Sequence, residues 1–140
     1  MAFIKVGETP KEKSRLYIMN IVLPSGLTVV KIGKSSGHSS KERMQQINGS
    51  IFDKFRTTAM ISIKRDREVP SDLVFKYETT LHHFFADYQY NTPHKFSGST
   101  ETFVIPLEDA VMAYEAVISG EVPDFKYVLP AMVPDDNVPF

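Results

Sequence analysis

The sequence predicts a mixed α+β fold in a single domain. Two runs rich in β-forming residues flank a turn, a third such run follows a helical segment, and two later segments have helical patterns. With 140 residues, 42% of them hydrophobic and 24% charged, the chain suffices for one core but not for two ordinary domains. We expect an N-terminal arm at residues 1–14, an ordered domain at 15–120 and an acidic, proline-containing tail at 121–140.

The first two strands are predicted to form an antiparallel hairpin. Residues 16–23 and 27–32 are both rich in β-branched and other apolar side chains. Between them, Pro24 presets φ and Gly26 tolerates a positive φ, a combination typical of tight turns. Gly33 is expected to end the second strand, and a polar loop follows at 34–38.

A short helix and a third strand are predicted next. Ser39 and Glu42 have the spacing of a capping box, in which each side chain satisfies a free backbone donor, so a helix is expected over about 40–48. Residues 57–63 are expected to form the third strand, and the charged run 64–68 is expected to be a link.

Two helices and a short extended segment are predicted for the second half. Pro70 opens what we expect to be the longest helix, in which apolar side chains recur at helical spacing. The polar run 89–100 is expected to be a loop and 101–105 a short strand. Pro106 suits the first turn of a last helix, which should end near Ser119.

The composition excludes several classes of protein. There is no cysteine, so disulfides, thiolate zinc sites and thiol nucleophiles are excluded. The N-terminus lacks the apolar run of a secretory signal, and no apolar stretch is long enough to span a membrane. We therefore expect a cytoplasmic protein without a membrane partner.

Charge is distributed unevenly along the chain. Residues 1–70 hold 13 Lys and Arg against 6 Asp and Glu, whereas residues 71–140 hold 3 against 11, which together give the net charge of −1. One interpretation is a basic surface for phosphate and an acidic part that carries metal ligands or faces away from nucleic acid. The other is that the two halves mix in space.

Five short motifs occur in an order that resembles a known family. They are Arg15-Leu16-Tyr17, Lys31-Ile32-Gly33, Arg43, Glu78-Thr79-Thr80-Leu81-His82 and Glu101-Thr102-Phe103. Over residues 15–105 this order resembles the GIY-YIG nucleases, and most of all a phage-associated branch whose second motif reads Lys-Ile-Gly. The chain departs from the general pattern because its first motif lacks Gly and Ile and Lys31 replaces a tyrosine. The resemblance implies a GIY-YIG-like, three-stranded antiparallel sheet flanked by helices.

The resemblance also implies a metal-dependent DNA endonuclease and assigns roles to its residues. Tyr17 would act as general base, which requires cations such as Lys31 and Lys34 to favour its phenolate form. Arg43 would hold a phosphate oxygen with its planar guanidinium group. Without the resemblance, Tyr17 would be interpreted as a half-buried strand tyrosine, and Arg43 as a solvated arginine pairing with Glu42 or Asp53.

A carboxylate and a histidine on the long helix would complete the site. Glu78 would bind Mg²⁺, or Mn²⁺ as an alternative, and His82 lies four residues later on the same helix face. Glu101 is either a second carboxylate near the metal or an orienting partner for a cation, and His38 lies in a loop expected to border the substrate. A surface contact between Glu78 and His82 is the simpler alternative.

Two other functions remain open from the sequence. A nucleic-acid-binding module without catalysis would need only the basic strands and loop. A protein-interaction domain would use the acidic tail to bind a partner, alone or in addition to nuclease activity. DNA is the expected partner, and a homodimer is an open possibility because no separate recognition module follows the catalytic region.

Overall fold

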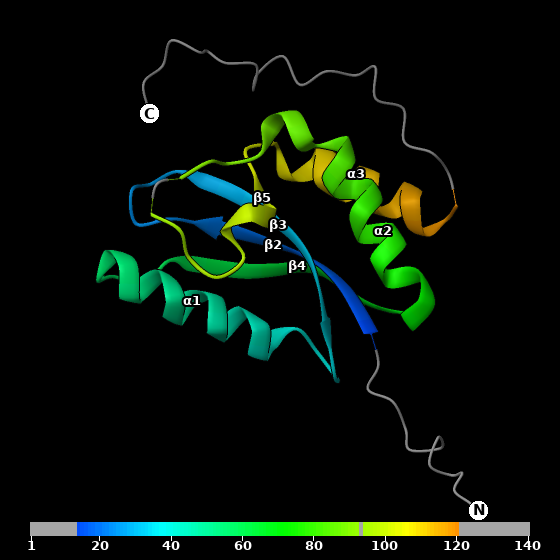
Figure 1. Ribbon diagram of the computed structural model, residues 1–140, viewed down its shortest axis with the longest axis horizontal. Coiled ribbons are helices and arrows are strands. Elements are labelled where there is room, and N and C mark those ends of the chain that lie inside the picture. Colours follow the sequence, from blue (N-terminus) through cyan, green and yellow to red (C-terminus); the bar gives the residue numbers. More distant parts are fainter. Residues whose placement is uncertain (1–13, 93, 121–140) are drawn as a thin grey trace, which may run out of the picture.

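The computed structural model describes residues 14–92 and 94–120, which form a sheet covered by helices on both faces. The sheet has four antiparallel strands in the order β4-β2-β3-β5. Helix α1 lies against one face, and α2 and α3 lie against the other (Figure 1). The predicted α+β fold class is therefore confirmed, and the short strand expected at 101–105 joins the three-stranded sheet that the resemblance implied as a fourth strand, β5.

The elements have the following bounds. The strands are β2 Ser14–Val22, β3 Thr28–Ser36, β4 Met60–Val69 and β5 Thr102–Phe103. The helices are α1 Lys41–Phe55, α2 Ser71–Phe84 and α3 Leu107–Ile118, and two short 3-10 helices, η1 and η2, span Ala86–Tyr88 and Ser99–Glu101. The expected arm and tail lie outside the described residues, apart from Ser14, which begins β2. Within the described ranges, no helix has both the length and the hydropathy that a membrane span needs.

The predicted hairpin is confirmed, but the expected end of its second strand at Gly33 is wrong, because β3 continues to pair with β2 as far as Ser36. β2 and β3 pair antiparallel, with Tyr17 opposite Gly33. The turn is closed by Leu23, whose N–H donates to the Leu27 carbonyl at 2.8 Å, and Gly26 has a φ of +96°. That φ lies in the region that glycine adopts more easily than other residues.

The expected link at 64–68 is wrong, because these residues belong to β4. Arg65 and Arg67 lie opposite Ile18 and Leu16 of β2. β4 is an edge strand, and edge strands accept charged side chains that would be costly in the middle of a sheet. The charges are also paired, since both arginines contact Glu115 of α3, at 2.9 and 3.0 Å.

The first helix differs from its prediction in length and in its start. α1 continues to Phe55 because Ile47 and Ile51 extend its buried stripe, so α1, with 15 residues, and not α2, with 14, is the longest helix. The capping box does not form. The N-cap residue Ser40 donates its backbone N–H to the Asp66 carboxylate of β4 at 2.8 Å.

The two faces of β2 enter two hydrophobic clusters. Leu16 and Ile18 pack beneath α2 and α3, while Tyr17 and Met19 pack against α1. Successive strand side chains point to opposite faces, so covering both faces buries every one of these four residues. Tyr17 is consequently a core residue, and its interpretation as a half-buried strand tyrosine is wrong.

Candidate active site

The candidate site lies at the edge of β3, where the short strand β5 ends. β5 pairs only with Val30 and Lys31, so the carbonyl of Ile32 lies beyond the pairing. That carbonyl lies 2.6 Å from Nε2 of His82 on α2. Because a carbonyl can only accept, Nε2 carries a proton in this contact. His82, from the face covered by α2, thus reaches this edge, and Tyr17 lies on the opposite face, which α1 covers.

Tyr17 and Lys31 converge on Gly33. A Cβ atom at Gly33 would stand 2.5 Å from the Tyr17 Oη and 2.7 Å from the Lys31 Nζ. Both side chains are fully buried, and the Tyr17 hydroxyl has no hydrogen-bond partner among the described residues. The ammonium of Lys31 lies 5.3 Å from the centre of the Tyr17 ring. The glycine of the second motif is thus required by close packing.

Replacing Gly33 with alanine is expected to lower the stability of the fold. The added methyl group must displace the Tyr17 hydroxyl or the Lys31 ammonium, and such overpacking costs about 1–3 kcal/mol. Thermal unfolding should show a melting temperature lower by about 4 °C for each kcal/mol. Gly49→Ala in α1 is the matched control, since nothing lies within 4 Å of its Cβ position and alanine favours a helix. A Gly33→Ala protein as stable as the wild type would contradict this packing.

Lys31 forms an ion pair with Glu101 of η2. The Lys31 side chain is fully buried, whereas the Glu101 side chain is 33% exposed. Partial burial raises the pKa of Glu101, but attraction to Lys31 and the hydrogen bond that Lys31 donates outweigh this, so the pKa is lowered overall from 4.5. The carboxylate is therefore held in its charged form beside a buried cation.

The stability contribution of Glu101 should depend on pH. A carboxyl whose pKa is lowered by folding stabilises the protein above its unfolded pKa of about 4.5, and this is lost as the pH falls through the folded value. Glu101→Gln should therefore lower the melting temperature at pH 7, in the presence of a chelator, and this difference should shrink below about pH 4.5. A difference between the two proteins that stays constant from pH 7 to pH 3 would contradict the pairing.

Arg43 of α1 reaches the same region and contacts the turn that contains Ser97 and Gly98. One of its guanidinium nitrogens donates to the hydroxyl of Ser97 at 3.1 Å and to Gln46 at 3.3 Å. Gly98 has a φ of +82°, and a Cβ there would stand 3.3 Å from both the Arg43 Nη2 and the Lys31 Nζ. The expected alternative, pairing of Arg43 with Glu42 or Asp53, is not observed, and the described partners of Arg43 are neutral.

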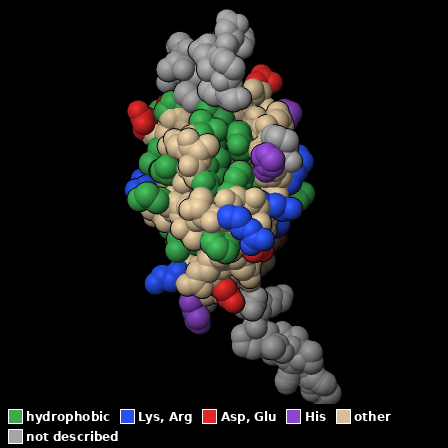
Figure 2. All heavy atoms as spheres, turned by 90° about the vertical axis from the view of Figure 1, so that its left-hand side faces the viewer, with side chains coloured by type: hydrophobic (Ala, Val, Ile, Leu, Met, Phe, Trp, Pro, Cys, Tyr) green, Lys and Arg blue, Asp and Glu red, His purple; other side chains and the backbone are tan. Residues whose placement is uncertain are grey.

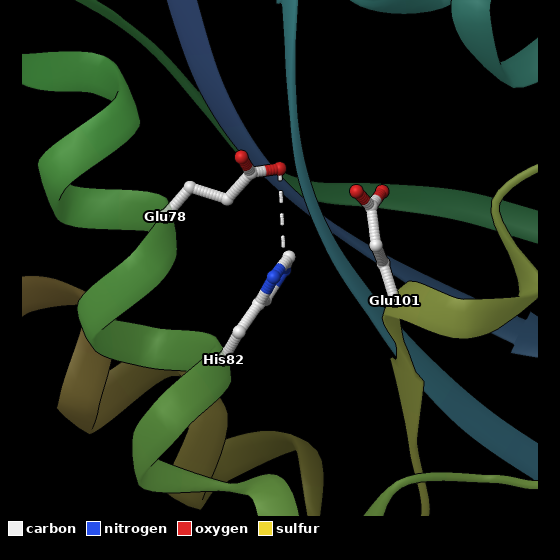
Figure 3. A group of neighbouring side chains, drawn as sticks. All are labelled: Glu78, His82 and Glu101. Atoms are coloured by element: carbon white, nitrogen blue, oxygen red, sulfur yellow. Dashed lines mark ion pairs between the residues drawn. The ribbon is translucent and has the colours of Figure 1, made fainter.

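Glu78, His82 and Glu101 form a group able to hold a cation. The first two extend from α2 and the third from η2, and their side chains point toward a common space (Figure 3). One potential ligand atom from each residue lies within 4.8 Å of those from the other two. Glu78 is 5% exposed, and its Oε2 has no hydrogen-bond partner in the described part of the chain. Two carboxylates and an imidazole are suitable ligands for a divalent metal ion.

The structure brings together seven of the eight sequence-predicted site residues. Lys34 lies beside Glu78, with 3.7 Å between its Nζ and the Glu78 Oε1, and its side chain is 47% exposed. His38 is exposed in the loop before α1 and contacts none of the other seven among the described residues. The other six are Tyr17, Lys31, Arg43, Glu78, His82 and Glu101.

Three supporting residues were missed from the sequence. Asp66 joins β2, β4 and α1, because it accepts hydrogen bonds from Arg15 at 2.7 Å and from both the backbone and the hydroxyl of Ser40 at 2.8 Å. Ser97 and Gly98 hold Arg43 and cover Lys31. Gly98 alone carried a sequence signal, since a glycine in a polar run suggests a turn.

The unequal halves of the chain mix in space. Lys31, Lys34, Arg65 and Arg67 of the basic half pair with Glu101, Glu78 and Glu115 of the acidic half. The described residues thus favour the second interpretation of the charge pattern. Basic side chains nevertheless gather on the surface, as in the lower half of the face in Figure 2.

Comparison with known proteins identified one family. The model of the T5orf172 domain matches residues 4–118. No curated protein and no solved structure matches the chain.

Proposed function

This chain belongs to the T5orf172 domain family, and we propose that it is a metal-dependent DNA endonuclease of the GIY-YIG type. T5orf172 domains occur in nuclease-like proteins of phages and mobile elements, which supports an origin in such an element. From such an element, the protein would act in the cytoplasm of the host cell. In this proposal, the residues at the edge of β3 hydrolyse a phosphodiester bond.

One observation carries the proposal: both buried side-chain polar atoms that lack a hydrogen bond in the described residues belong to this site. They are the Tyr17 Oη and the Glu78 Oε2. Folded proteins rarely leave buried polar atoms unpaired, and an unexplained exception is a reason to look for a ligand or a catalytic role. A nucleophilic water beside Tyr17 and a metal ion on Glu78 would satisfy both atoms.

Tyr17, Arg43 and Glu78 each have a separate role in the proposed reaction. Tyr17, whose ring centre lies 5.3 Å from the ammonium of Lys31, takes a proton from the attacking water. Arg43, whose described partners are neutral, holds a phosphate oxygen. As oxygen from water joins phosphorus, the bond to the 3′ oxygen breaks, and the departing oxygen takes up a proton from solvent, leaving a 5′ phosphate and a 3′ hydroxyl. Glu78 would hold a divalent ion, and that ion would supply charge stabilisation of the phosphate and of the departing oxygen.

A non-catalytic nucleic-acid-binding module is the alternative function. It would use Lys34, Arg43 and the exposed basic side chains for phosphate contacts, which require neither a tyrosine nor a carboxylate. It gives no reason for the unpaired Glu78 oxygen in the core of the site. The catalytic proposal explains that oxygen as a metal ligand.

The test is cleavage of supercoiled plasmid by the purified chain. Nicked or linear product should appear with Mg²⁺ or Mn²⁺ and disappear with a chelator; Tyr17→Phe should reduce its formation strongly, and Glu78→Gln should abolish it. Glu115→Gln is the matched control, because that carboxylate pairs with Arg65 and Arg67 away from the site. Cleavage that survives both site substitutions would refute the site, and salt-sensitive DNA binding without cleavage would favour the binding module.

A further inference from the structure

Glu101 lies between two possible partners. One of its oxygens binds the buried ammonium of Lys31, while its side chain also points toward Glu78 and His82 (Figure 3). The side chain is 33% exposed, so it has room to turn toward either partner. Its own pairing with Lys31 therefore competes with any role in metal binding.

One oxygen of the Glu78 carboxylate has no hydrogen bond among the described residues and could bind a metal ion. The Oε2 of Glu78 is buried without a hydrogen bond in the described residues, and Lys34 and His82 approach this carboxylate only to 3.7 and 4.0 Å. Histidines that bind metals usually donate their other ring N–H to a carbonyl or carboxylate. His82 already donates its Nε2–H to the Ile32 carbonyl. The nitrogen that faces the Glu78 Oε2, at 4.0 Å, is this same Nε2, so metal binding by His82 requires either rotation of the imidazole ring to present Nδ1 or release of the Ile32 carbonyl.

We propose that Glu101 changes partners when a divalent ion binds: it leaves Lys31 and joins Glu78 and His82 as a third metal ligand. The proposal rests on the proposed function for the metal at Glu78, but it does not require cleavage. Because one ligand is an imidazole, the site should bind Mn²⁺ more tightly than Mg²⁺, which prefers oxygen ligands.

The exchange would connect metal binding to substrate binding. Once Glu101 has left, the fully buried ammonium of Lys31 has lost its anionic partner. An unpaired buried charge is costly, so a phosphate oxygen becomes a favourable replacement. The substrate would then enter a site in which Lys31 has become available through metal binding. Metal and phosphate would each strengthen binding of the other, since such coupling is reciprocal.

Calorimetric titration with Mn²⁺ alone tests the exchange. Glu101→Gln and His82→Asn should each weaken Mn²⁺ binding by about tenfold or more, as expected for loss of a ligand, whereas Glu115→Gln should not. Lys31→Met should tighten binding because it removes the competitor. In a double-mutant cycle, that gain should be clearly smaller in the Glu101→Gln background, where no competition remains.

The titrations can contradict the exchange in two ways. Wild-type affinity in Glu101→Gln, or an equal gain from Lys31→Met in both backgrounds, would overturn the exchange. If Lys31→Met does not fold, the Glu101→Gln and His82→Asn titrations decide alone. The nuclease proposal is judged separately: the expected Mn²⁺ cycle without plasmid cleavage refutes the nuclease alone, and metal-dependent cleavage with an unaffected Glu101→Gln affinity refutes the exchange alone.

Discussion

Tyr17→Phe is expected to reduce metal-dependent plasmid cleavage by about 10²–10⁴-fold, the range for loss of a general base. The same change should leave the protein folded and make it more stable. The Tyr17 hydroxyl is buried without a hydrogen bond in the described residues, and an unpaired buried polar group costs about 1–3 kcal/mol. Parallel measurements of cleavage rate and thermal unfolding should therefore change in opposite directions.

Tyr114→Phe is the matched control for this prediction. Tyr114 of α3 is equally buried, but its hydroxyl donates to the Leu16 carbonyl at 2.7 Å, and burial raises the pKa of Tyr114 to about 12. Removing this hydroxyl breaks a hydrogen bond, so stability should fall by about 1 kcal/mol while cleavage continues. If both substitutions reduced cleavage equally, or if Tyr17→Phe were the less stable protein, Tyr17 would be a structural residue.

The elements that depend on local sequence were predicted correctly. The hairpin was predicted because Pro24 and Gly26 favour a turn locally, and the runs beside it are rich in β-forming residues. The start of α2 at Ser71 follows from Pro70, which lacks a donor that a helix N-terminus does not need. Such features require only neighbouring residues, so they can be inferred from one sequence.

The features that were missed depend on contacts between distant parts of the chain. Asp66 caps α1 from another strand, which made the local pair Ser39 and Glu42 a misleading signal. The charged end of β4 is a strand because β2 pairs with it and α3 neutralises it. Contacts between residues so far apart in the sequence are set by tertiary packing, so no local sequence pattern predicts them.

In the candidate site, too, some features could be inferred from the sequence and others depend on contacts between distant residues. The resemblance chose Tyr17, Arg43 and Glu78, but burial of Tyr17 and Lys31 follows from helices covering both faces of the sheet. Contact between Lys31 and Glu101 follows from β5 joining the edge of β3. Sequence order therefore indicated the members of the site, and only the fold indicates which of them interact.

Glu78→Gln is expected to abolish cleavage, because an amide is a far weaker ligand than a carboxylate for Mg²⁺ or Mn²⁺. Loss of Mn²⁺ binding in calorimetry should accompany the loss of cleavage. The helix should remain intact, since Glu78 makes its ion pair with Lys34, which is exposed enough to be solvated without it. Circular dichroism should therefore match that of the wild type.

Glu78→Met separates the catalytic role of this residue from a structural one. Methionine fills a similar volume without a charge, and replacing buried charged groups with apolar ones is often neutral or stabilising, by about 1–4 kcal/mol. Glu78 is 5% exposed and one of its oxygens is unpaired, so the melting temperature should stay the same or rise while cleavage is lost. A large fall in melting temperature would instead mean that Glu78 supports the fold through its contacts with Lys34 and His82. The unpaired oxygen would then have to be explained without a metal ion.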